Sequence, residues 1–109
     1  MREPVFSGAF YPQERESLEQ EVTHYIHQAN VTPSKHVVNA IISPHAGYMY
    51  SGAVAGHGMR AIQNQTYDTV IVMGPSHRHY FEGASVYEGA GYLTPLGGLY
   101  TNTFLADTI

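Results

Sequence analysis

The sequence predicts an α/β fold in which a sheet with a parallel strand–helix–strand unit is flanked by helices. Two apolar runs rich in β-branched residues, residues 37–43 and 69–73, are typical of buried strands. The stretch 51–63 between them has the length of a crossover helix, with Ser51 as its cap. A chain of 109 residues, 43% hydrophobic and 13% charged, fits one domain, residues 1–109, with one modest core.

The N-terminal region combines an irregular segment with the clearest helix of the sequence. Residues 1–12 hold prolines, a glycine and several aromatic side chains, so we expect an ordered arm that packs on the rest of the chain. Residues 13–29 carry apolar side chains at helical spacing, with glutamates near the start, where the helix dipole favours negative charge. The glycines within 51–63 weaken the second predicted helix and indicate close packing on the sheet.

Beyond the second predicted strand the chain is rich in glycine and tyrosine. Residues 84–87 are a candidate strand, residues 94–98 a turn, and Asn102 the cap of a further helix. Only seven residues follow Asn102, and so short a helix is marginal alone. We therefore expect a fragment that ends inside an element whose apolar face needs further residues; a natural C-terminal turn of helix is the alternative.

Composition narrows the classes of function. The net charge is −4 and the five Lys and Arg residues are scattered, so no basic stripe predicts nucleic-acid binding. Cysteine is absent, which excludes disulfides, thiolate ligands and a cysteine nucleophile within this sequence. We find no signal peptide and no apolar run of about 18 residues, and therefore expect a cytoplasmic protein without a membrane partner.

Two histidines, His45 and His77, stand just past the ends of the two predicted strands. Their interval of 32 residues matches one strand–helix–strand unit. Parallel neighbours lie about 4.8 Å apart, so both imidazoles would emerge at one carboxyl edge, where open α/β sheets bind ligands. Each histidine alone could simply hydrogen-bond within a turn, but the pair favours a shared site that holds a metal or moves a proton.

The other polar candidates carry weaker signals. His79 ranks second, because it could join the pair or face the opposite way. We assign His24 and His27 to the solvated surface, His57 to packing and His36 to a loop. Tyr48 and Tyr50 could donate hydrogen bonds to a bound anion or oxygen species, or be ordinary core aromatics. The serines beside the histidines, Ser43, Ser51 and Ser76, lie in no G-x-S-x-G elbow, which disfavours nucleophilic hydrolysis.

Four motifs follow one another in the order found in a known family. Residues 44–48 read Pro-His-Ala-Gly-Tyr, with Tyr-Ser-Gly at 50–52, and residues 74–77 read Gly-Pro-Ser-His. Residues 8–12 read Gly-Ala-Phe-Tyr-Pro, and residues 94–97 read Thr-Pro-Leu-Gly. On these motifs the chain resembles the N-terminal part of the Memo family, whose prokaryotic members are named AmmeMemoRadiSam system protein B. The resemblance implies a fold similar to that of class III extradiol ring-cleaving dioxygenases.

The resemblance also implies a metal site. His45 and His77 match two histidines that hold iron or copper in the family and would be the catalytic residues here. From their positions beside His45, and not from the resemblance, we expect Tyr48 and Tyr50 to contact the bound group. The family's remaining groups, a cysteine and an Asp/His pair, come from a C-terminal half that this sequence lacks. Because two imidazoles alone hold a redox metal weakly, we expect micromolar or weaker binding by these residues.

Two functions of different classes follow from that resemblance. The first is a metal-dependent redox enzyme with dioxygenase-like activity. The alternative is a non-catalytic protein that binds a metal or a partner's peptide in signalling. Hydrolysis by a metal-bound hydroxide needs the same ligands and is not separated from the first by sequence. For prokaryotic members the resemblance further implies association with a radical-SAM protein and a third protein.

Overall fold

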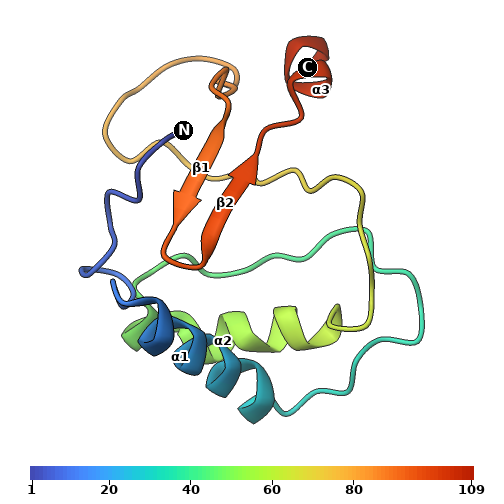
Figure 1. Ribbon diagram of the computed structural model, residues 1–109. Coiled ribbons are helices and arrows are strands. Elements are labelled where there is room, and N and C mark those ends of the chain that lie inside the picture. Colours follow the sequence, from blue (N-terminus) through green and yellow to red (C-terminus); the bar gives the residue numbers. More distant parts are fainter.

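The computed structural model describes residues 1–109 as a small α/β protein. Two helices lie against each other. Extended segments separate this helix pair from a two-stranded antiparallel hairpin and a short C-terminal helix (Figure 1). The elements are α1 (Arg15–Gln28), α2 (Tyr48–Ala61), β1 (Gly91–Thr94), β2 (Gly97–Tyr100) and α3 (Thr103–Thr108). No helix has both the length and the apolar character needed to cross a membrane.

Helix α1 confirms the helix predicted over residues 13–29, with slightly trimmed ends. Its Leu18 is 3% exposed, and Ala29, which follows the helix, is the other buried apolar residue. Apolar side chains at helical spacing thus place one face of α1 toward the rest of the chain, as the pattern predicted. The opposite, polar face of α1 stays in solvent.

Helix α2 begins three residues earlier than predicted, and Ser51 is not its cap. The N-cap position is Gly47, and Ser51 lies inside the first turn, where its hydroxyl donates to the carbonyl of Ala46 at 3.2 Å. The amide of Tyr48 donates to the carbonyl of Phe10 at 2.8 Å. Because the N-terminal arm accepts this otherwise unpaired helical N–H, α2 can start without a capping side chain.

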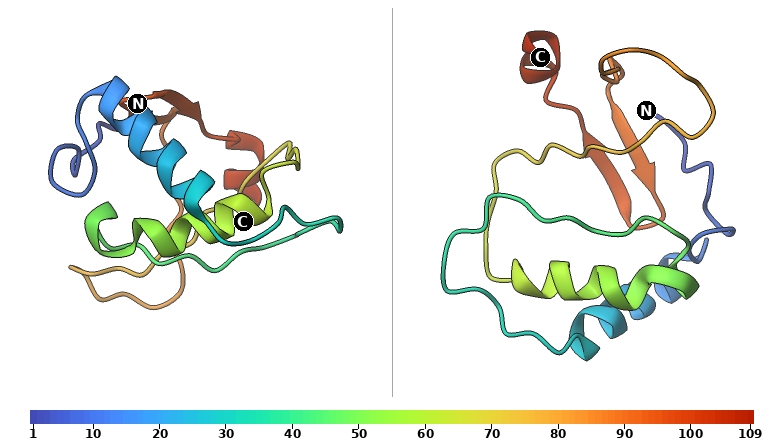
Figure 2. Two further views of the ribbon diagram at one scale, coloured as in Figure 1. Left: turned by 90° about the horizontal axis from the view of Figure 1, so that it is seen from below. Right: turned by 180° about the vertical axis from the view of Figure 1, so that it is seen from behind.

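Two of the three glycines of α2, Gly52 and Gly56, pack on α1 and not on a sheet, which corrects the prediction. A Cβ at Gly52 would lie 2.6 Å from the ring of Tyr25, and a Cβ at Gly56 would collide with the backbone carbonyl of the same tyrosine. Figure 2 shows the two helices crossing each other. The glycines therefore let two helices approach closely.

The predicted parallel strands over residues 37–43 and 69–73 are not formed. Both segments are extended, yet neither makes a backbone–backbone hydrogen bond, and Ile42 is fully exposed. A strand exists only when a neighbouring strand accepts and donates along its ladder, and these two segments do not pair with each other. The candidate strand at 84–87 is likewise absent.

The only sheet is a two-stranded hairpin, of which the sequence predicted the turn. Thr94 and Gly97 form the last pair of the β1–β2 register, which confirms the turn predicted at 94–98. The N-terminal arm adds to β1: the amide of Arg2 donates to Gly91, and Leu93 donates back to Arg2, at 2.7 and 2.8 Å. This bridge orders the arm, as we expected.

Helix α3 confirms Asn102 as its cap. The Asn102 side-chain oxygen accepts from the amide of Leu105 at 3.2 Å, and its amide group donates to the hydroxyl of Thr69 at 3.2 Å. The same residue therefore starts α3 and ties it to the second extended segment.

Candidate functional site

The structure brings His45 and His77 together. Their Nε2 atoms lie 3.1 Å apart, with ring centroids at 5.2 Å and the ring planes inclined by 46°. His45 precedes α2, and His77 follows the second extended segment. The contact joins residues 32 positions apart, as their placement past two apolar runs predicted.

The two extended segments run in the same direction even though they form no ladder. At their starts, the side chain of Gln65 accepts from the amide of Val38 at 2.8 Å, and the hydroxyl of Tyr67 donates to the carbonyl of Val38 at 2.8 Å. At their ends, His45 meets His77. Side-chain contacts at both ends thus hold the parallel arrangement that a backbone ladder was expected to hold.

Hydroxyl groups shape the loops that carry the histidines. The hydroxyl of Ser76 donates to the carbonyl of His79 and accepts from its amide, which closes a tight turn that contains His77. Ser43 donates to the carbonyl of Pro44, and Ser51 holds Ala46 as described above. None of the three serine hydroxyls is bonded to an imidazole nitrogen, so no serine–histidine pair of the kind that activates a nucleophile is formed.

The distance between the two imidazole nitrogens fits a shared metal ion. Two nitrogens that each lie about 2.0–2.1 Å from one ion, at tetrahedral or right angles, would be about 2.8–3.4 Å apart. The observed 3.1 Å lies in this interval. No third His, Cys, Asp or Glu joins them in a cluster of metal-ligating groups. The chain therefore holds two imidazole nitrogens at a spacing compatible with one ion.

The two tyrosines next to His45 occupy different surroundings. Tyr48 is half-buried between Tyr11 and Tyr25, at ring-centroid distances of 5.7 and 6.3 Å. Burial raises the pKa of Tyr48 above its ordinary value of 10.0, and the neighbouring Tyr11 and Glu21 raise it further. Tyr50 is 79% exposed. Tyr48 thus lies within an aromatic cluster, whereas Tyr50 lies on the surface.

The remaining histidines lie apart from the pair. The amide of Asn30 donates to Nε2 of His57 at 3.3 Å, and Nδ1 of His57 lies 2.8 Å from the carbonyl of Ala53, so His57 is occupied by backbone hydrogen bonds. The other four are exposed: His24, His27, His36 and His79. His79 joins the pair in no cluster of three or more metal-ligating side chains.

A pocket adjoins His45 that the sequence did not reveal. It has a volume of about 470 Å³ and lies between the N-terminal arm, the start of α2 and β1. Phe6, Phe10, Tyr48 and Tyr92 lie in its walls together with His45. The aromatic content of residues 1–12 was the available signal, but only the structure shows which distant segments meet there.

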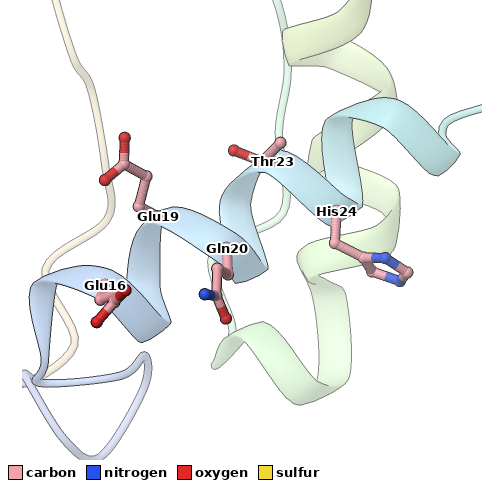
Figure 3. A pocket seen from close by; sticks show the side chains of 5 residues that line it. All are labelled: Glu16, Glu19, Gln20, Thr23 and His24. Atoms are coloured by element: carbon pink, nitrogen blue, oxygen red, sulfur yellow. The ribbon is translucent and has the colours of Figure 1, made fainter.

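A second hollow lies on the exposed face of α1 and is lined by polar side chains alone. Figure 3 shows its side chains, which project from the helix in different directions: Glu16, Glu19, Gln20, Thr23 and His24. This is a solvated polar helix face, which agrees with the surface assignment of His24.

Comparison with known proteins decides the family. The family model described as Memo-like protein matches residues 2–109. The chain belongs to the Memo family. Among its relatives, a MEMO1 family protein of Thermoplasma acidophilum is 32% identical over 111 residues, and one of Methanosarcina mazei is 36% identical over 107 residues. The resemblance drawn from the four motifs is thereby confirmed.

The Memo-like relatives are longer than this chain. The two matches cover 99% and 98% of the chain but only 40% and 38% of the respective relatives. A MEMO1 family protein of Nitrosopumilus maritimus, 34% identical, is matched over 37% of its length. No solved structure matches the chain.

Proposed function

We propose that this Memo-like chain contributes His45 and His77 to a non-haem iron or copper site and that the site serves metal-dependent redox chemistry. The observation that carries the proposal is the 3.1 Å separation of the two Nε2 atoms. The common direction of the two extended segments supports the placement of this site at their shared end. A bound iron or copper ion would supply electron exchange with an oxygen species.

The residues of this chain would bind and orient the ion. Each imidazole would donate its Nε2 lone pair, which requires the neutral form of both rings with the proton on Nδ1. In the absence of an ion, Nε2–H of one neutral ring can donate a hydrogen bond to Nε2 of the other. Acid should therefore weaken metal binding, because protonation removes both lone pairs.

A calorimetric titration with Cu²⁺ tests the ligand assignment. We expect one site of micromolar or weaker affinity, because the chain presents two donors. His45→Ala and His77→Ala should each lower the affinity by at least about tenfold, since losing a ligand costs no less than losing a group that supports one. His79→Ala is the matched control and should leave the affinity unchanged. Tight binding that survives His45→Ala would contradict the proposal.

Oxygen consumption tests the redox part separately. The metal-loaded chain should consume oxygen in the presence of a reductant faster than the His45→Ala, His77→Ala double variant under the same conditions. Equal rates in the two proteins would remove the redox proposal and leave a metal-binding or peptide-binding role.

A further inference from the structure

The two histidines of the pair are supported by the main chain to different degrees. His45 lies just before α2. The amide and the hydroxyl of Ser51 donate to the carbonyls of Gly47 and Ala46, at 3.1 and 3.2 Å. The amide of Tyr48 donates to a carbonyl of the N-terminal arm. The main chain after His45 is therefore fixed both by the first turn of a helix and by a second segment of the protein.

His77 lies in a segment that lacks such support. Residues 66–89 make no backbone–backbone hydrogen bond, and residues 66–86 are all exposed. Within residues 70–89, the hydroxyl of Ser76 is the only side-chain group that bonds to the main chain, through the carbonyl and the amide of His79. Serine hydroxyls close turns in this way in place of a backbone contact. The turn that contains His77 is thus held by one side chain.

A second contact, on the other side of His77, is weaker. The guanidinium carbon of Arg78 lies 6.0 Å from the centroid of the Phe6 ring in the N-terminal arm. This distance is at the outer limit of a cation–π attraction, and at exposed sites such an attraction is small. Arg78 therefore brings the loop toward the arm, whereas Ser76 fixes the shape of the turn.

We propose that Ser76 is the positioning residue of the histidine pair, because its hydroxyl holds His77 where His77 meets His45. The pair then consists of one donor on a rigid support and one donor whose position depends on a single hydroxyl group. Without that hydroxyl the loop gains conformational freedom, so the two Nε2 atoms, 3.1 Å apart in the structure, are in contact in fewer molecules. The consequence for metal binding rests on the proposed function, whereas the positioning of His77 does not.

Nuclear Overhauser spectroscopy without metal tests the positioning. The ring protons next to Nε2, Hδ2 and Hε1, should give a cross-peak between His45 and His77 in the wild-type chain. Ser76→Ala should weaken this cross-peak by about two- to fivefold, the usual worth of one hydrogen bond. Ser76→Thr should keep the cross-peak, because a threonine hydroxyl can close the same turn.

Ser34 provides the matched control. Its hydroxyl donates to the carbonyl of His36 and accepts from its amide, both at 3.1 Å, in the loop after α1. Ser34→Ala therefore removes the same kind of contact from another loop and should leave the cross-peak unchanged. Absence of the cross-peak in the wild type, its full retention in Ser76→Ala, or an equal loss in Ser76→Thr or Ser34→Ala would each overturn the assignment of Ser76.

A calorimetric titration with Zn²⁺ then connects the positioning to the proposed metal site. Ser76→Ala should weaken Zn²⁺ binding by the same factor as it weakens the cross-peak, because only molecules with His77 in place present both donors. In the His77→Ala background, Ser76→Ala should cause no further loss, since no imidazole remains to be positioned. A further loss in that background would show that Ser76 acts in another way and would overturn the proposal.

The outcomes separate this inference from the proposed function. Absence of any metal binding by the wild type would contradict the proposed function, while the cross-peak in Ser76→Ala would still decide the role of Ser76. Metal bound through both histidines with equal affinity in the wild type and Ser76→Ala would leave the proposed function intact and overturn the positioning role.

Discussion

The hydroxyl of Tyr48 belongs to an aromatic cluster in which its ionised form is unfavourable. Burial is the main cause of its raised pKa, followed by Tyr11 and Glu21, and the pKa of Tyr25 is raised by burial and by the charge of Glu21. The folded state thus holds these protons more tightly than the unfolded chain does. The resulting stabilisation is fully present below pH 10.0 and is lost as the pH rises through the raised pKa.

We therefore predict that the free energy of unfolding falls in alkaline solution and that Tyr48→Phe makes this fall smaller. Urea unfolding followed by circular dichroism at a series of pH values above pH 8 measures the effect. Tyr50→Phe, an exposed neighbour, is the matched control and should follow the wild type. An unchanged alkaline fall in Tyr48→Phe would show that Tyr48 is not the group responsible.

At the level of single residues, the sequence predicted the meeting of His45 and His77 well. The prediction relied on their positions past two apolar runs, and the chain direction preserves that relation although no ladder forms. The surroundings of Tyr48 could not be predicted, because Tyr11 and Tyr25 reach it from separate segments. Local spacing does not indicate such long-range contacts.

The contact between α1 and α2 depends on the absence of a side chain at Gly56. A Cβ there would meet the carbonyl of Tyr25, which is backbone and cannot move aside alone. We predict that Gly56→Ala lowers the free energy of unfolding by about 1–3 kcal/mol, the usual cost of overpacking. Thermal or urea unfolding measures this loss.

Gly58 provides the matched control in the same helix. A Cβ at Gly58 would lie 3.4 Å from Cδ1 of Ile41, close to an ordinary contact with a flexible side-chain end. Gly58→Ala should therefore be neutral or stabilising, because alanine favours a helix by about 1 kcal/mol over glycine. Equal destabilisation by both substitutions would contradict the close helix contact.

Among the elements, the helices were predicted better than the strands. The helix over 13–29 and the cap at Asn102 depend on residues within one or two turns, so local sequence specifies them. The segments 37–43 and 69–73 have the composition of strands, but a strand also needs a partner ladder, which composition does not supply. The sequence therefore predicted their extended form and direction and was wrong about their pairing.

Across the whole molecule, apolar side chains that were predicted to form a core remain in contact with solvent. Val37 and Val72 are 82% and 88% exposed, whereas Leu18 and Ala29 are the buried apolar residues. The family was predicted correctly from four short motifs spread along the chain, because four motifs in one fixed order are more specific to a family than any single apolar run is. The pocket beside His45 was missed, since it depends on three segments that meet only in space.

The central claim is that His45 and His77 act as one pair of nitrogen donors. Two-dimensional ¹H–¹⁵N NMR of the imidazole groups during a titration with Zn²⁺, a diamagnetic probe, tests it directly. We predict that the Nε2 resonances of both histidines move together with one common dependence on Zn²⁺ concentration, before those of His24, His27, His36 and His79. Movement of only one of the two, or separate dependences for His45 and His77, would contradict the claim.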